Sequence, residues 1–170
     1  MKPFLFLAGI FLVLVALEFS FIASLPGWIA MTPVIVAVSL SLSVHFGKRE
    51  TLWFMVAQGF FLDVLHLGIL PLETVSYAIA ASAAYLCARF VFSGRSFYGL
   101  IACGIATSLA FLSSQGALLL LISLRDAAPQ TWPAFFSSAL IRSLMLFCLL
   151  TVLFFRSSPI KRLASFYERL

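Results

Sequence analysis

The side chains that could do chemistry in this chain lie inside long apolar stretches. The main candidates are Glu18, Gln58, Asp63, His66, Gln115 and Arg142. Asp63 and His66 form an acid–imidazole pair at helical spacing, but no nucleophile stands beside them in a recognised motif. The chain also lacks a glycine-rich phosphate loop and the spacing of metal ligands. We therefore expect no enzyme activity, no cofactor and no metal site.

Gly59, Asp63 and His66 share one face of a predicted helix. Gly59 precedes Asp63 by four residues and His66 follows it by three, the two spacings that align side chains along a helix. A glycine allows a neighbouring helix to approach closely. The carboxylate of Asp63 has two readings that the spacing leaves open. It could cap a neighbour's backbone or sit in interfacial water, or it could contact a ligand or a partner protein.

The composition indicates an integral membrane protein. The chain has 170 residues, of which 63% are hydrophobic and 10% are charged, whereas soluble domains carry about 25% charged residues. The net charge of +5 is no sign of a nucleic-acid partner. Lys and Arg occupy short loops between apolar stretches, where they orient spans and contact anionic lipid.

Six apolar stretches predict an all-α bundle of about six transmembrane helices. They cover residues 4–25, 28–46, 51–66, 72–92, 97–124 and 132–155 approximately. Residues 113–116 are polar and predict a flexible break in the fifth stretch. Two stripes of small residues predict close helix packing: Ser76, Ala80 and Ala84 in one, and Gly99, Cys103 and Thr107 in the other.

The last part of the chain has a different pattern. Ser158 and Pro159 suit the N-cap and the first position of a helix, and apolar residues then follow on one face. We expect residues 1–155 to form the transmembrane domain. Residues 156–170 are expected to form a short basic amphipathic helix that lies on the membrane and binds anionic lipid.

Basic residues set the predicted orientation, with both termini in the cytoplasm. Under this topology the following residues lie at cytoplasmic ends: Lys2, Lys48, Arg49, Arg89, Arg95, Arg156, Lys161, Arg162 and Arg169. Glu18 and Arg142 then have similar depths in the outer half of the membrane, where an unpaired charge is costly. We predict an ion pair between them, with Asp63 as the alternative partner of Arg142. Together with Gln115 these groups would form either a polar clasp between helices or a small outward-facing cavity.

Residues 33–86 contain a set of short motifs in a fixed order: Pro33, the basic pair Lys48-Arg49, Gly59 four residues before Asp63, and Ala84-Tyr85-Leu86 in the following stretch. With these motifs the segment resembles the MreD family, a small multispan component of the bacterial rod-shape machinery. The family has a proline near the start of its second span, a short basic loop and a span ending in Gly-x-x-x-Asp. The chain departs from the family at Met55, where a further glycine is common.

The resemblance implies a non-enzymatic scaffold in the bacterial cytoplasmic (inner) membrane. Such a scaffold would bind the bitopic protein MreC and other proteins of cell shape and cell-wall synthesis. An alternative comes from a different class of protein. Six spans with polar groups in the outer half also look like the substrate-binding component of an energy-coupling-factor transporter, which takes up a small solute.

Overall fold

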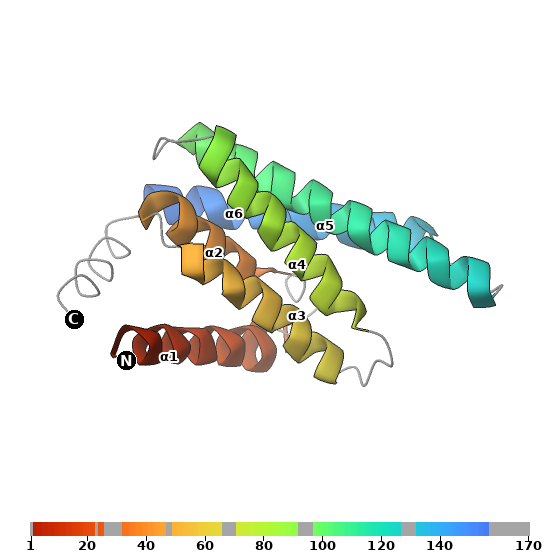
Figure 1. Ribbon diagram of the computed structural model, residues 1–170, viewed down its shortest axis with the longest axis horizontal. Coiled ribbons are helices and arrows are strands. Elements are labelled where there is room, and N and C mark those ends of the chain that lie inside the picture. Colours follow the sequence, from red (N-terminus) through yellow and green to blue (C-terminus); the bar gives the residue numbers. More distant parts are fainter. Residues whose placement is uncertain are drawn as a thin grey trace.

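The computed structural model of this protein describes residues 2–22, 24–25, 32–46, 49–65, 71–91, 97–126 and 132–156 (Figure 1). Within these residues the regular structure is helical, which confirms the all-α prediction. The elements in chain order are α1 (Lys2–Ala16), the π-helix η1 (Leu17–Ile22), α2 (Val34–Phe46), the 3₁₀-helix η3 (Arg49–Leu52), α3 (Trp53–Leu65), α4 (Leu72–Leu86), the π-helix η4 (Cys87–Val91), α5 (Phe97–Asp126) and α6 (Trp132–Phe155).

Two of these helices are long and apolar enough to cross a membrane, judged by length and composition. They cover Phe97–Leu121 in α5 and Trp132–Phe155 in α6. Shorter apolar helical stretches occur at Ala8–Ser20 and Val34–Val44. The helices α1, α2, α3 and α4 have 13 to 15 residues each, fewer than the ~20 that a span usually needs.

The helices form one bundle in which successive α-helices alternate in direction (Figure 1). The most extensive contacts join α4 to α5 and α3 to α4, and α6 packs on α2 and α5. Aromatic pairs attach α1 and η1 to α3: the ring centroids of Phe11 and Phe54 are 5.3 Å apart, and those of Phe19 and Phe61 are 5.2 Å apart. Because the directions alternate, the first residue of α1 and the last of α6 lie toward the same end.

The core lies where α2, α3, α4, α5 and α6 converge. Leu40, Met55, Leu100 and Leu150 are almost completely buried there. Both predicted stripes of small residues are buried as well: Ser76, Ala80, Ala84, Gly99, Cys103 and Thr107. Small side chains let helix backbones approach closely, in keeping with the extensive contact between α4 and α5.

One predicted helix start and one predicted break within a helix need correction. The second helix begins at Val34, because proline fits best at the start of a helix, and the N–H of Ala37 donates to the carbonyl of Pro33 at 3.1 Å. The expected break at residues 113–116 is wrong, since α5 continues through it. The hydroxyls of Ser113 and Ser114 donate to carbonyls one turn earlier, at 3.0 and 2.8 Å. Residues 157–170 of the predicted amphipathic tail lie outside the described residues.

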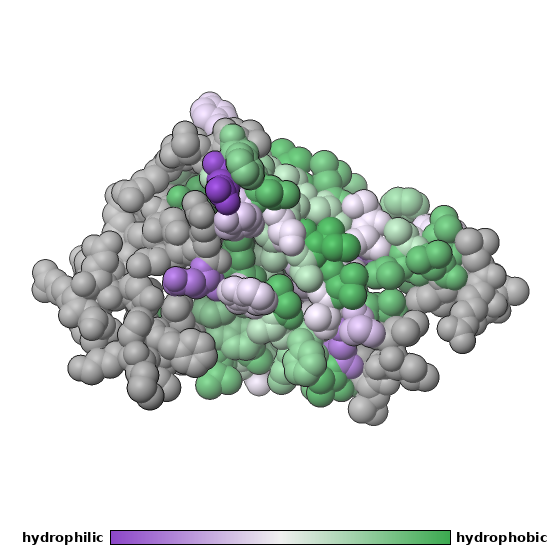
Figure 2. Space-filling model, in the orientation of Figure 1, coloured by the Kyte–Doolittle hydropathy of each residue, from purple (hydrophilic) through white to green (hydrophobic). Residues whose placement is uncertain are grey.

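Hydrophobic residues cover most of the described surface on the face drawn in Figure 2. Large apolar side chains are exposed on several helices. On α6 they form one row, with Phe136, Leu140 and Leu144 at four-residue spacing and Val152 eight residues further on, each more than half exposed. We call this row the α6 ridge. An apolar surface of this kind suits lipid or a partner helix better than water.

Candidate functional site

Glu18 joins three helices near the start of α2. It lies in η1, and its two carboxylate oxygens have different partners. Oε2 accepts a hydrogen bond from the backbone N–H of Ile35 at 2.8 Å, and Oε1 accepts one from Gln58 Nε2 at 2.6 Å. The first N–H groups of a helix have no partner within the helix, and a negative charge there also interacts favourably with the helix dipole. Glu18 therefore caps α2 and links it to α3.

The predicted ion pair between Glu18 and Arg142 is wrong within the part of the chain that the structure describes. Both oxygens of Glu18 are engaged by Ile35 and Gln58, and no ion pair joins Glu18 to Arg142 there. Arg142 remains an electrostatic neighbour of Glu18. The similar predicted depths of Glu18 and Arg142 therefore indicated correctly that the two residues lie near one another. The direct hydrogen-bond partners of Glu18, however, are the N–H of Ile35 and the side chain of Gln58.

Asp63 caps α4 from the neighbouring helix α3. Its Oδ1 accepts a hydrogen bond from the N–H of Glu73 at 3.0 Å, and its Oδ2 accepts from the N–H and the hydroxyl of Thr74 at 2.8 and 2.5 Å. The residue at the N-cap position of α4, Pro71, makes no side-chain capping bond. Of the two readings left open for Asp63, the structure shows the backbone cap. The alternative pairing of Asp63 with Arg142 is not formed among the described residues.

Gly59 contacts the same turn of α4 that Asp63 caps. A Cβ atom at Gly59 would lie 2.8 Å from the carbonyl oxygen of Glu73 and 2.9 Å from the Cα of Thr74. Both are backbone atoms, which cannot rotate away as a side chain can. Gly59 and Asp63 are thus the two halves of one contact, which we call the α3–α4 lock. His66, expected on the same face, lies outside the described residues.

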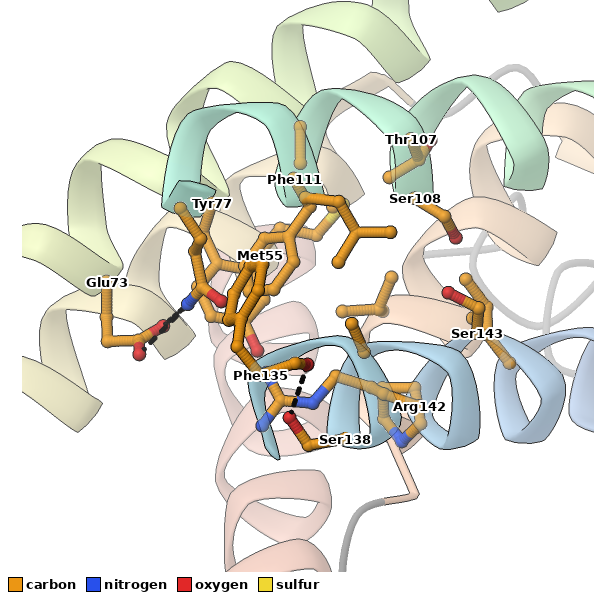
Figure 3. Close-up of a pocket in the computed structure, with 17 residues that line it drawn as sticks. Met55, Glu73, Tyr77, Thr107, Ser108, Phe111, Phe135, Ser138, Arg142 and Ser143 are labelled. Carbon is orange, nitrogen blue, oxygen red and sulfur yellow. Dashed lines mark hydrogen bonds between the residues drawn. The ribbon is translucent and has the colours of Figure 1, made fainter. Parts of the chain in front are cut away.

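Gln115 binds a carboxylate that the sequence did not single out. Its Nε2 donates to both oxygens of Glu73, at 3.1 and 3.0 Å, and so links α5 to α4 (Figure 3). Glu73 lies in the first turn of α4, a position that favours acidic residues generally. One signal in the sequence could have identified Glu73: like Glu18 and Asp63, it is a carboxylate within an apolar stretch.

A half-open cavity of about 130 Å³ lies between α2, α3, α4, α5 and α6. Its apolar wall includes Met55, Phe111 and Leu112, while Glu73 and Gln115 line another part. Arg142 reaches into it from α6 (Figure 3). A site for one water needs roughly 10–15 Å³, and an engineered cavity of about 150 Å³ binds benzene. This cavity therefore has room for several waters or one small organic molecule.

Arg142 has an unusual environment for a charged residue in an apolar bundle. Its Cζ lies 5.7 Å from the centroid of the Phe111 ring, a cation–π contact, and that ring packs on Tyr77 with centroids 4.8 Å apart. Among the described residues, neither a hydrogen bond nor an ion pair to Arg142 is present. Its guanidinium carries five N–H donors, so the cavity contains a cation with unused donor capacity.

The predicted site residues make their contacts in three places, which Glu73 and the electrostatic contact of Glu18 with Arg142 connect. Glu18 and Gln58 form the first, Gly59 and Asp63 the second, and Gln115 and Arg142 line the cavity. Gln58 is 1% exposed, and its Oε1 has no hydrogen-bond partner among the described residues. No group of three or more possible metal ligands occurs in the described ranges. Comparisons of the chain with models of protein families, with curated proteins and with solved structures give no significant match.

Proposed function

We propose that this chain is an MreD-like, non-enzymatic scaffold of the bacterial cell-wall elongation machinery, held in the inner membrane by six spans. The observation that carries the proposal is the α3–α4 lock. Gly59 and Asp63 are the residues on which the resemblance to MreD chiefly depends. In this chain they act on the same turn of α4, at Glu73 and Thr74. The shared motif therefore corresponds to one architectural contact.

The proposal of six spans rests on the continuity of the helical segments. The π-helix η1 directly extends α1, η3 leads directly into α3, and η4 directly extends α4. With these extensions, α1 and α4 approach the ~20 residues of a span, whereas α2 and α3 have 13 residues each within the described part of the chain. Alternating directions bring the start of η3, the end of η4 and the end of α6 toward one end of the bundle (Figure 1). Arg49 begins η3, Arg89 belongs to η4, and Arg156 follows α6. Basic residues favour the cytoplasmic side, so this end and both termini are proposed to face the cytoplasm.

Cysteine labelling tests the topology. Glu50 and Pro71 are both exposed; Glu50 lies in η3, which leads into α3, and Pro71 directly precedes α4, whose start is capped by Asp63 near the other end of α3. In a background without Cys87, Cys103 and Cys148, a membrane-impermeant reagent added to intact cells should label Pro71→Cys and leave Glu50→Cys unlabelled. Lysed cells should label both, which controls for reactivity. Labelling of Glu50→Cys in intact cells contradicts the proposed orientation.

The α6 ridge is the proposed contact surface for the single transmembrane helix of an MreC-like partner. Rows of side chains at four-residue spacing are the ridges that pack into the grooves of another helix. The exposed Leu140 and Leu144 lie at the middle of this row. Charged groups are costly in such a position, so an apolar partner helix is a suitable occupant. The basic tail, residues 156–170, is proposed to bind anionic lipid.

Substitutions on the ridge test the scaffold. Leu140→Trp with Leu144→Trp should reduce co-purification of an MreC-like partner at least fivefold and round the cells on depletion of the native copy. Leu12→Trp is the matched control, because Leu12 is 66% exposed on α1. Gly59→Leu, an obvious alternative, is unsuitable because it would disrupt the α3–α4 lock. Undiminished co-purification and normal cell shape in the ridge variant would contradict the proposed surface.

The cavity at Arg142 favours a second candidate function, the substrate-binding component of an energy-coupling-factor-type transporter. Such a component binds a solute within its helical bundle, and the cavity offers space and polar groups for one. Neighbouring genes separate the two candidates. Genes for a filament protein and MreC favour the scaffold, whereas genes for ATPase subunits favour transport. Saturable solute uptake that is lost in an Arg142 variant would also favour transport.

A further inference from the structure

The contacts that Arg142 makes with described residues do not use its hydrogen-bond donors. Glu73, which lines the cavity, and Glu18, an electrostatic neighbour of Arg142, are already engaged by other donors. Glu18 accepts from Ile35 and Gln58, and both oxygens of Glu73 accept from Gln115. The contact of Arg142 with the Phe111 ring stabilises its charge without using a hydrogen-bond donor. The planar fork of donors is therefore available to an anion in the cavity.

Two hydroxyl groups face the same space. Ser108 on α5 and Ser143 on α6 line the cavity, and their oxygens point toward one another across it (Figure 3). Neither makes a hydrogen bond to another described residue. Met55, Leu112 and Leu146 are among the apolar residues of the remaining wall, which also contains the hydrogen-bonded pair of Glu73 and Gln115. The cavity thus combines one cation, hydroxyl groups, an apolar surface and one carboxylate that already accepts from Gln115.

We propose that this cavity binds a small organic carboxylate, with the carboxylate on Arg142 and the apolar body against Phe111 and its neighbours. Guanidinium groups match carboxylates geometrically, because two parallel N–H donors reach the two oxygens. A volume of about 130 Å³ limits the body to about the size of a benzene ring. Small pockets with apolar walls and a few polar groups that fix orientation are typical ligand sites. The site goes beyond the scaffold function and does not depend on it.

Benzoate is a suitable probe, since it has one carboxylate and a body of the right size. Labelled benzoate should bind saturably to the purified full-length chain in nanodiscs, measured by equilibrium dialysis against empty nanodiscs. Arg142→Gln should weaken this binding about ten- to hundredfold, the range expected for loss of a charged hydrogen-bonding partner. Arg142→Lys keeps the charge and loses the fork, so its effect should be intermediate.

Three controls make the result specific. Arg89→Gln should leave benzoate binding unchanged, because Arg89 is exposed, binds Tyr85 at 3.0 Å and does not line the cavity. Ser143→Leu fills the cavity and keeps Arg142, so it should also abolish binding, which covers the case in which Arg142→Gln fails to fold. Unlabelled benzamide, the neutral isostere, should compete at least tenfold less well than unlabelled benzoate.

The proposal is overturned if benzoate shows no saturable binding above that of empty nanodiscs. It is also overturned if Arg142→Gln binds benzoate as tightly as the native chain, or if benzamide competes equally well. These results say nothing against the scaffold, whose test is co-purification of the partner with ridge variants. Conversely, loss of partner binding in the ridge variants leaves the benzoate measurement unaffected.

Discussion

Gly59→Ala should destabilise the protein even though alanine is the better helix former. In a helix interior, replacing glycine by alanine normally stabilises by about 0.5–1 kcal/mol. At Gly59 the new methyl group would lie 2.8 Å from the carbonyl oxygen of Glu73 and 2.9 Å from the Cα of Thr74. Since these are backbone atoms, α3 and α4 must move apart to relieve the contact.

The expected net loss is about 2 kcal/mol. Overpacking by a methyl group costs about 1–3 kcal/mol, and the gain in helix propensity offsets about 0.5–1 kcal/mol of this. Separation of the helices also lengthens the hydrogen bonds from Glu73 and Thr74 to Asp63, and loss of a helix cap costs about 1 kcal/mol. Gly59→Ala should therefore weaken both contacts of the α3–α4 lock, because the methyl group and the Asp63 cap act on the same turn of α4.

The other glycines provide the controls. A Cβ at Gly9 would have no atom within 4 Å, and one at Gly116 would meet Phe135 at 4.0 Å, so Gly9→Ala and Gly116→Ala should be neutral or stabilising. Gly104→Ala should lie between, because its nearest neighbour at 2.8 Å is the flexible end of Leu150. Unfolding by increasing mole fraction of SDS in mixed micelles measures the series. If Gly59→Ala is as stable as Gly9→Ala, the close contact inferred here is refuted.

Two further predictions concern the carboxylates. Asp63→Ala should destabilise by about 1–2 kcal/mol, and Asp63→Asn by less, because one amide oxygen replaces two acceptors; equal losses in SDS unfolding would contradict the cap. In a double-mutant cycle, Glu18→Ala and Gln58→Ala should couple by about 0.5–3 kcal/mol, whereas Glu18→Ala and Arg142→Ala should couple more weakly. A larger coupling for the second pair would restore the ion pair with Arg142 as the main interaction of Glu18.

Helical spacing was sufficient to place Gly59 and Asp63 on one face of α3, because the period of the helix fixes which residues align. It could not identify the neighbour of that face, which depends on how α3 packs on α4. The same limit explains the error at Glu18. Counting residues along two helices gives the depth of Glu18 and Arg142, but the rotation of each helix decides which group reaches the other.

Glu73 and the polar run at residues 113–116 show two further limits of reasoning from the sequence. Glu73 lies at the start of the fourth apolar stretch, and its partner Gln115 comes from α5, a contact that spacing along one helix cannot indicate. Serine and glutamine are polar enough to suggest a break. In an apolar bundle, however, serine hydroxyls can bond to carbonyls of the preceding turn, as Ser113 and Ser114 do, and the helix continues.

One physical rule accounts for the carboxylates that interrupt apolar helices here. Glu18 and Asp63 each accept the free N–H groups at the start of a different helix, α2 and α4 respectively. Free N–H groups are costly where water is absent, and so is a carboxylate without donors. A hydrogen bond between the two therefore satisfies the N–H groups of one helix and the carboxylate of its neighbour. Arg142 cannot act in this way, since it has donors and no acceptor. The small carboxylate proposed for the cavity beside Arg142 would supply such acceptors, and the cavity has space for it.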